Sequence, residues 1–183
     1  MNADLIVVGS CARGMLGRVF VGDDARAALN GASCAIAVAA RAYAAQPRPF
    51  ATIGVGYNET TEAKAALAAA RDIAAASGAS IHALEAVSFP EYVYNALAFG
   101  IVTRLVEEAN DRLAMLPGVS GHAASGYAGE ELAIFSADLD LLVVGSRSYG
   151  PLRRLVFGST SAYLERHARC SLLVLPRPAV ESR

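Results

Sequence analysis

The sequence predicts an α/β protein with an open parallel sheet and helices on both of its faces. Short apolar runs of strand length alternate with longer stretches of helical periodicity through most of the chain. The strand-like runs are apolar at consecutive positions, as expected for strands that are buried on both faces. Strands and helices that alternate in this way build parallel sheets of the doubly wound kind.

The elements of the main unit follow one another in this alternating order. The expected strands are Phe50–Tyr57, Ala79–Val87, Gly118–Tyr127, Asp140–Gly145 and Ser171–Pro176. The expected helices are Thr60–Gly78, Ile101–Leu116, Ala128–Leu139 and Gly158–Arg166, and Ser88–Gly100 is expected to be irregular or lid-like.

Local signals support the first two of these helices. Thr60 or Thr61 can cap the first helix, alanine fills its interior, and Gly78 ends it. Apolar residues recur along one face of the second helix between Ile101 and Leu113, with charged residues elsewhere.

The chain also contains an internal repeat. Matching residues are separated by a constant offset of 136 positions, as in the pairs Gly9 and Gly145, Gly22 and Gly158, and Cys34 and Cys170. We therefore expect a partial strand–helix–strand unit over residues 1–43, a linker over 44–49 with Pro47 and Pro49, and a complete unit over 50–183.

A lone strand–helix–strand unit cannot bury its own apolar faces and edges. We expect the strand at Ala35–Ala39 to pair with Ser171–Pro176 in the same or a neighbouring chain. The strand at Asp4–Val8 would then leave an open edge that favours homo-oligomers. An alternative is that the sequence begins inside a longer tandem protein.

Composition excludes several classes of function. The formal net charge of −1 gives no electrostatic reason to expect nucleic acid or an anionic membrane as partner. The cysteines, Cys11, Cys34 and Cys170, lack CxxC spacing, so we expect reduced thiols and no metal site. No apolar stretch approaches the ~20 residues of a membrane span, and no export signal is evident, which predicts a cytoplasmic protein.

One strand–loop–helix passage carries the candidate chemistry. Gly145 ends an apolar strand, and after a loop Gly158-Ser159-Thr160 opens a helix. The free amides and positive dipole end of a helix start favour an anion, and a hydroxyl adds a donor. The alternative is that the glycines only turn the chain and Ser159 only caps the helix. The spacing is neither that of a P-loop nor that of a dinucleotide fingerprint.

At these residues the chain resembles the universal stress protein family. Nucleotide-binding members of that family carry G-x2-G-x9-G-[ST] between the fourth strand and the last helix. Gly145 and Gly158-Ser159 match this motif at its spacing, whereas Ser148 replaces the middle glycine and Gly150 follows two residues later. The tail "RHARCSLLVLPRP" is similar to the family's closing turn and strand.

The resemblance implies a five-stranded parallel sheet that holds ATP, with or without Mg²⁺, at its carboxyl edge, and dimers formed through the last strand. Asn58 stands where the family has an aspartate near the nucleoside. The implied nucleotide-binding residues are Gly56, Tyr57, Asn58, Ala86, Val87, Gly145, Ser146, Arg147, Ser148, Gly150, Gly158, Ser159 and Thr160. In the partial unit, Asp23 and Asp24 occupy the positions of Ser159 and Thr160 and would repel a phosphate, so we expect no second site there.

Three functional hypotheses follow. The first is a stress-response module that binds an adenine nucleotide and acts through dimerisation or partner binding. The second is an interaction module of the same fold with a degenerate site, which works without nucleotide. The third is an enzyme that cleaves or transfers adenylate, but no nucleophile or general base stands out, so at most slow ATP hydrolysis is expected.

Overall fold

The computed structural model describes residues 3–11, 15–22, 32, 34–45, 47–88, 96–146 and 158–176, and for 96–99 it describes the backbone alone. Within these residues the chain forms β1 (Leu5–Gly9), β2 (Ala35–Ala39), η1 (Tyr43–Ala45), β3 (Thr52–Gly56), α2 (Thr61–Ser77), β4 (Ser80–Val87), α3 (Ala96–Ala114), β5 (Val119–Ser125), α4 (Ala128–Phe135), η2 (Ser136–Asp138), β6 (Leu141–Gly145), α5 (Ser159–His167) and β7 (Ser171–Leu175).

The strands and helices expected between residues 50 and 176 are all present, with ends that shift by a few residues. The exception is α3, which begins at Ala96, inside the segment expected to be irregular. The helix continues through Gly100, because a single glycine costs a helix only about 1 kcal/mol relative to alanine. The helix expected between β1 and β2 falls outside the described residues.

All seven strands belong to one sheet with the order β1-β2-β7-β6-β3-β4-β5. The five strands of the main unit, β3 to β7, pair in parallel, which confirms the predicted open parallel sheet. The strand pair β1–β2 is also parallel, and β2 joins the main unit by antiparallel pairing with β7. The expected pairing of Ala35–Ala39 with the last strand is therefore confirmed, and it occurs within the chain.

The offset of 136 residues also relates the two strand pairs in space. Leu5 pairs with Ala35, and their equivalents Leu141 and Ser171 pair in the same way, as do the four following positions. The antiparallel contact is symmetric as well, because Ala37 pairs with Leu173, its own equivalent. The strands β1–β2 and β6–β7 are thus related by a local two-fold axis between Ala37 and Leu173.

This arrangement affects the dimer that the resemblance implies. Both edges of β7 are paired within the chain, one with β6 and the other with β2, so the last strand has no free edge for a second copy. Among the strands of the N-terminal part, β1 keeps a free edge. A homodimer through that edge stays a prediction.

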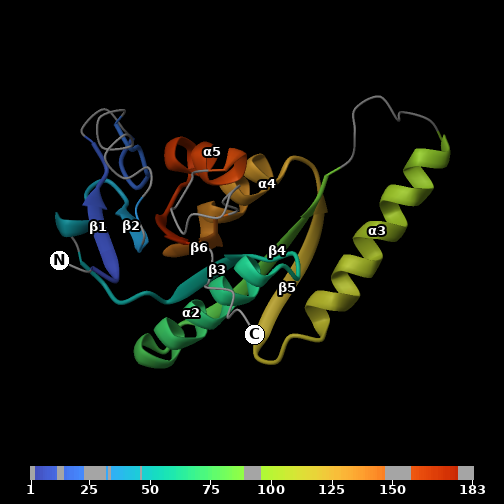
Figure 1. The fold of residues 1–183 in the computed structure, drawn as a ribbon, viewed down its shortest axis with the longest axis horizontal. Coiled ribbons are helices and arrows are strands. Elements are labelled where there is room, and N and C mark those ends of the chain that lie inside the picture. The colour runs from blue at the N-terminus through green and yellow to red at the C-terminus, as the bar shows by residue number, and fades with distance from the viewer. Residues whose placement is uncertain are drawn as a thin grey trace.

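Helices cover the two faces of the sheet in separate layers (Figure 1). One core cluster joins α4, α5 and the segment around Val19 to β2, β4, β6 and β7. The other joins α2 and the end of α3 to the opposite face of β3, β6 and β7. Alternate residues of β6 enter alternate clusters, since Leu142 and Val144 face the first and Leu141 and Val143 the second.

The ends of α2 follow the sequence signals. The hydroxyl oxygen of Thr60 accepts a hydrogen bond from the amide of Ala63 at 3.3 Å, and Thr60 is the N-cap. Gly78 ends the helix in the left-handed conformation at φ 75°, and its amide donates to the carbonyl of Ala74. Because both caps are satisfied locally, α2 has a fixed length, and its first turn reaches the carboxyl end of β3.

At the amino ends of the central strands, Asp140 connects the start of β6 to the start of β3. Its carboxylate accepts hydrogen bonds from the amides of Ala51 at 2.8 Å and Thr52 at 3.0 Å. The guanidinium of Arg48 lies 2.9 Å away and connects the segment before β3 to the same group. Burial alone would raise the pKa of Asp140, but these hydrogen bonds and Arg48 lower it below the ordinary value.

Replacing this aspartate is expected to weaken the fold in a pH-dependent way. In Asp140→Asn the two amides lose a charged acceptor, so we expect a loss of about 1.5–3 kcal/mol in the free energy of unfolding at pH 7. Since the folded-state pKa is lowered, this contribution is present above pH ~4 and is lost as the pH falls through the folded-state value. Urea denaturation of both proteins between pH 3 and pH 7 measures it.

The repeat provides a matched control for this experiment. Asp4 is the equivalent of Asp140 and is exposed, so Asp4→Asn should change the free energy of unfolding by less than about 0.5 kcal/mol. Equal losses in the two variants, or a loss in Asp140→Asn that does not shrink at low pH, would contradict the proposed role of the Asp140 carboxylate.

Candidate functional site

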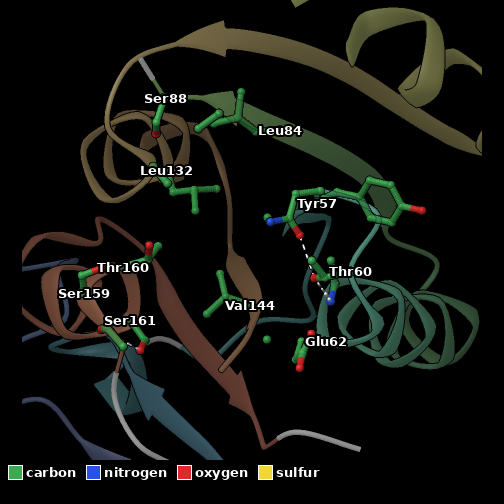
Figure 2. A pocket seen from close by; sticks show the side chains of 17 residues that line it. Tyr57, Thr60, Glu62, Leu84, Ser88, Leu132, Val144, Ser159, Thr160 and Ser161 are labelled. Atoms are coloured by element: carbon green, nitrogen blue, oxygen red, sulfur yellow. Dashed lines mark hydrogen bonds between the residues drawn. The ribbon is translucent and has the colours of Figure 1, made fainter. Parts of the chain in front are cut away.

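A cavity of about 340 Å³ lies at the carboxyl ends of β3, β4 and β6 (Figure 2). The chain moves outward from β3 through β4 to β5 and then returns to β6 on the other side of β3, so the strand order reverses between β3 and β6. Ligands of open α/β sheets bind at such a reversal, and the volume is at the lower end of the range for small-molecule sites.

The cavity wall combines strand ends with helix starts. From the strands and the residues that directly follow them it takes Gly56, Tyr57, Asn58, Leu84, Ala86, Ser88, Val144 and Gly145. From the starts of α2, α4 and α5 it takes Thr60, Glu62, Ala63, Ala128, Leu132, Gly158, Ser159, Thr160 and Ser161.

Most of the site residues expected from the sequence meet at this cavity. Gly56, Tyr57, Asn58, Ala86, Gly145, Gly158, Ser159 and Thr160 line it. Val87 and Ser146 are not among the lining residues, and Arg147, Ser148, Gly150, Asp23 and Asp24 lie outside the described residues. That these residues hold a nucleotide stays a prediction.

The backbone groups of Val87 and Ser146 take part in hydrogen bonds of the sheet and its turns. The carbonyl of Val87 accepts from the amide of Gly126 at 3.1 Å, which ties the end of β4 to the turn after β5. The amide of Ser146 donates to the carbonyl of Leu175 at 2.8 Å and extends the pairing of β6 with β7. The carbonyl of Val87 and the amide of Ser146 therefore stabilise the sheet and the turn beside it.

Tyr57 contributes its backbone to the cavity, because its ring points away from it. Figure 2 shows the ring on the far side of the strand end, and the side chain is buried in the cluster beneath α2. Burial, together with the carboxylates of Glu59 and Glu85, raises the pKa of the Tyr57 phenol, which stays neutral at pH 7. The role of Tyr57 in the core fixes the direction in which the chain leaves β3.

Asn58 is held by its neighbour in the same turn. The hydroxyl of Thr60 donates to Asn58 Oδ1 at 2.8 Å and at the same time accepts from the amide of Ala63. This pairing uses the amide oxygen of Asn58, so its NH₂ group is the end that can donate to a ligand. Asn58 thus offers a neutral donor at the start of the cavity.

In the part of the chain that the structure describes, three helices begin at the cavity, and only the start of α5 suits an anion. The first turn of α2 is capped by Thr60 and contains Glu62, and that of α4 contains Glu130 and Glu131. The first turn of α5 has no acidic residue, and its N-cap, Gly158, has no side chain with which to cap the amides. The amides of the first turn of α5, which have no partner within the helix, and its positive dipole end therefore lie at the cavity, with no carboxylate in that turn.

The hydroxyl residues of this turn differ in their surroundings. Ser159 is exposed and Thr160 half-buried, and Figure 2 shows both beside the cavity, across from Thr60 and Glu62. Ser161 is buried, and its hydroxyl donates to the carbonyl of Gly158 at 3.2 Å. Ser159 and Thr160 are thus the hydroxyl groups that can reach a ligand, whereas Ser161 stabilises the turn.

Gly145 is required by the packing of α2. A Cβ atom on Gly145 would lie 2.6 Å from the carbonyl oxygen of Glu62 and 2.7 Å from its Cβ atom. The missing side chain lets the first turn of α2 approach β6, which brings Glu62 to the cavity wall. Close approach of a ligand to this backbone, which a glycine also permits, stays a prediction.

The N-terminal part of the chain supports α5 from behind. The amides of Val19 and Val21 donate to the carbonyls of Ala168 at 3.0 Å and Glu165 at 3.1 Å. Both valines are buried in the cluster that contains Leu164 and Ala168. The last turn of α5 is therefore held by the N-terminal part, while its first turn lines the cavity.

Other groups of chemical interest have structural explanations. Arg112 lies 2.6 Å from the Glu85 carboxylate and 3.5 Å from that of Glu59, and this hydrogen-bonded contact with Glu85 raises the pKa of Arg112. Burial raises the pKa of the Cys170 thiol to about 12, so it stays protonated. Among the described residues, no three His, Cys, Asp or Glu side chains gather as a metal site requires, and no helix is long and apolar enough to cross a membrane.

The fold and the cavity together define an open α/β domain with a small-molecule pocket at the reversal of strand order. Comparison with known proteins then identifies its family. The model of the universal stress protein family matches residues 49–176, and the chain belongs to this family. Universal stress proteins of Mycobacterium tuberculosis and Mycobacterium bovis are 29% identical over 94% of the chain, which spans 62% of their length.

Solved structures share the fold at lower identity. A structure from Pseudomonas aeruginosa named as a universal stress protein superimposes with a TM-score of 0.68 and 18% sequence identity, and the match covers 95% of this chain and 64% of the other. A universal stress protein from Archaeoglobus fulgidus superimposes with a TM-score of 0.62 and 20% sequence identity, and the match covers 97% of this chain and 64% of the other. The universal stress protein UspA of Lactobacillus plantarum superimposes with a TM-score of 0.57 and 24% sequence identity, and the match covers 70% of this chain and 99% of the other.

Proposed function

We propose that the cavity binds an adenine nucleotide, with ATP as the expected ligand, and that the protein is a stress-response module that acts through this binding. The observation that carries the proposal is the start of α5. Among the described helices that begin at the cavity, α5 is the one with neither a side-chain cap nor an acidic residue in its first turn. An anionic group is stabilised at such a position by the amides of the first turn and by the helix dipole.

The rest of the cavity supports a nucleoside at the other end. Leu84, Leu132 and Val144 give it an apolar wall that suits the face of a base. Asn58 offers an NH₂ donor beside this wall, since its oxygen is bound by Thr60. An anion-binding end and an apolar end within one cavity are the features that a mononucleotide needs.

Mg²⁺, if it accompanies the nucleotide, is expected to be bound mainly by phosphate oxygens and water. Glu62 is the one carboxylate among the described residues that line the cavity. The described wall contains no pair of groups arranged as nucleophile and general base, and we propose binding without rapid turnover.

The alternative function is an interaction module that works without nucleotide. The observation that favours it is Asn58, which lacks the charge of the family's aspartate. The two functions differ in whether nucleotide changes the protein, so a binding measurement separates them.

Calorimetric titration tests the proposal directly. We expect one nucleotide site per chain and at least tenfold tighter binding of ATP than of adenosine, because adenosine cannot use the start of α5. Nucleotide released from freshly purified protein and identified by chromatography provides an independent measurement. Absence of bound nucleotide, together with no heat from ATP, ADP or AMP in the presence or absence of Mg²⁺, would favour the interaction module.

A further inference from the structure

The turn between β3 and α2 contains a residue in an unfavourable backbone conformation. Glu59 has a φ of 59°, in the left-handed region that glycine adopts freely and other residues adopt rarely. It lies between Asn58, which lines the cavity, and Thr60, the N-cap of α2. A residue other than glycine keeps this conformation where surrounding contacts hold it, and such residues are frequent at ligand sites. The contacts of Glu59 therefore bear on the geometry of the cavity.

The carboxylate of Glu59 forms an ion pair with an arginine of α3. Its Oε2 atom lies 3.5 Å from Nε of Arg112 and makes no hydrogen bond with it. The Nη2 atom of the same guanidinium donates to Glu85 Oε1 at 2.6 Å. The side chain of Glu85 is only 10% exposed, so this second contact anchors the guanidinium to β4. Arg112 thus holds Glu59 through a group that is itself fixed to the sheet.

This ion-pair network lies on the face of the sheet opposite to the cavity. On β4, Leu84 and Ala86 line the cavity, and Glu85 between them faces the other way, as alternate residues of a strand do. The ring of Tyr57 points away from the cavity as well (Figure 2), and burial and then the carboxylates of Glu59 and Glu85 raise the pKa of its phenol. Arg112 therefore contacts the turn from behind the cavity wall.

Burial in this network makes the charge of Glu59 important to Arg112. Within the described residues, Arg112 Nε and Glu85 Oε2 are buried and make no hydrogen bond. A buried donor without an acceptor costs free energy. The guanidinium therefore favours positions of the turn in which the Glu59 carboxylate stays beside Nε, although the Glu59 side chain is itself 57% exposed.

The turn transmits this restraint to the cavity. Asn58 and Thr60 flank Glu59, and their side chains are joined because the hydroxyl of Thr60 donates to Asn58 Oδ1 at 2.8 Å. The same hydroxyl accepts from the amide of Ala63 in α2. A change of the backbone at Glu59 would move both flanking residues and separate these groups. The direction of the Asn58 NH₂ group, the donor that a ligand can use, thus depends on Glu59.

We propose that Glu59 and Arg112 are positioning residues for the nucleoside end of the cavity. Arg112, anchored by Glu85, holds the left-handed turn through the Glu59 carboxylate, and the turn directs the NH₂ group of Asn58 at the nucleoside. This inference rests on the proposed function, because the ligand that Asn58 serves is the nucleotide. It adds that the nucleoside end depends on α3, on the far face of the sheet, whereas the phosphate end depends on α5.

Calorimetric titration of three variants tests the proposal. Glu59→Gln keeps the size of the side chain and removes its charge, and Arg112→Lys keeps a charge for Glu85 but lacks the fork that contacts both carboxylates. Each should weaken the binding of ATP and of adenosine by the same factor, about threefold to fivefold. Glu59→Gly adopts the left-handed conformation without cost and should weaken binding likewise, because the carboxylate is lost. Wild-type affinity in Glu59→Gly would overturn the proposal, since the backbone conformation alone would then suffice.

A double-mutant cycle separates positioning from a general effect on the fold. Asn58→Ala removes the group that the turn directs, so adding Glu59→Gln to it should change the ATP affinity by less than about twofold. Equal losses with and without the Asn58 side chain would overturn the proposal. Glu108→Gln is the matched control, because Glu108 pairs with Arg104 at 2.9 Å on the same helix. It should leave both affinities unchanged, and a loss equal to that of Glu59→Gln would contradict the specific role of Glu59.

Hydrogen exchange in the absence of nucleotide tests the turn independently of the proposed function. The amide of Ala63 reports on the turn, because its acceptor is the hydroxyl of Thr60. Its exchange, followed by NMR, should be about threefold faster or more in Glu59→Gln and in Arg112→Lys, and unchanged in Glu108→Gln. Unchanged exchange in all three variants would overturn the proposal even if nucleotide binds. Faster exchange in a protein that binds no nucleotide would support the hold of Arg112 on the turn and contradict the proposed function alone.

Discussion

Replacing Ser159 with aspartate is expected to weaken ATP binding at least tenfold while leaving the fold intact. Ser159 is exposed in the first turn of α5 and lines the cavity. A carboxylate there repels the phosphates and competes for the amides that would bind them, and a tenfold loss corresponds to about 1.4 kcal/mol. The same charge is favourable for the isolated helix, by about 0.3–1 kcal/mol. Calorimetric titration and thermal unfolding measure the two effects separately.

Two controls make this experiment specific for the anion. Ser159→Asn has a side chain of similar shape without the charge, and it should retain most of the ATP affinity. Adenosine carries no phosphate, so its binding should be nearly the same in the wild type and in Ser159→Asp. If ATP binds both proteins equally well, the phosphate is not at the start of α5, and the proposed orientation of the nucleotide is wrong.

Replacing Gly145 with alanine is expected to destabilise the fold and to impair the cavity together. The new Cβ atom would meet the backbone of Glu62 at 2.6 Å, and backbone cannot move aside as a flexible side chain can. Overpacking of this kind typically costs about 1–3 kcal/mol. The first turn of α2 must move away from β6, which displaces Glu62 and Ala63 on the cavity wall. Chemical denaturation gives the stability, and titration with ATP gives the effect on binding.

The repeat again offers a control of the same chemistry. Gly9 is the equivalent of Gly145, and a Cβ atom on Gly9 would have nothing within 4 Å. Gly9→Ala should therefore leave the free energy of unfolding within about 0.5 kcal/mol of the wild type. Similar losses at Gly9 and Gly145 would show that the flexibility of glycine matters more than the contact with α2.

The sequence predicted the main architecture because its signals are local. Strand-length apolar runs alternate with capped helices, and the caps at Thr60 and Gly78 are where the residue types indicate. The need of the N-terminal strands to bury their apolar edges also predicted that Ala35–Ala39 would pair with the last strand. It could not predict that the pairing would occur within the chain, because a pairing between two chains offers the same residues to each other.

The site was predicted in part. The turn after β3 and the start of α5 were found because their residues are polar or glycine in a recognisable order. Leu84, Leu132 and Val144 were missed because apolar residues in strands and helices look like core, although Leu84 could have been inferred from Ala86, two positions along the same strand face. The resemblance also implied Val87 and Ser146, which are not among the lining residues of the cavity, and the carbonyl of Val87 and the amide of Ser146 take part in the hydrogen bonds of the sheet and its turns.

The local two-fold axis has a consequence for how the two halves can diverge. In a contact between two identical chains, the residue on the axis must face a copy of itself, so two β7 strands would bring Leu173 against Leu173. Here Ala37 faces Leu173, and a small side chain lies opposite a large one. Both strands of this contact belong to one chain, so a mutation changes one side alone. A large side chain can then face a small one, which is impossible on the axis of a homodimer because both positions carry the same residue.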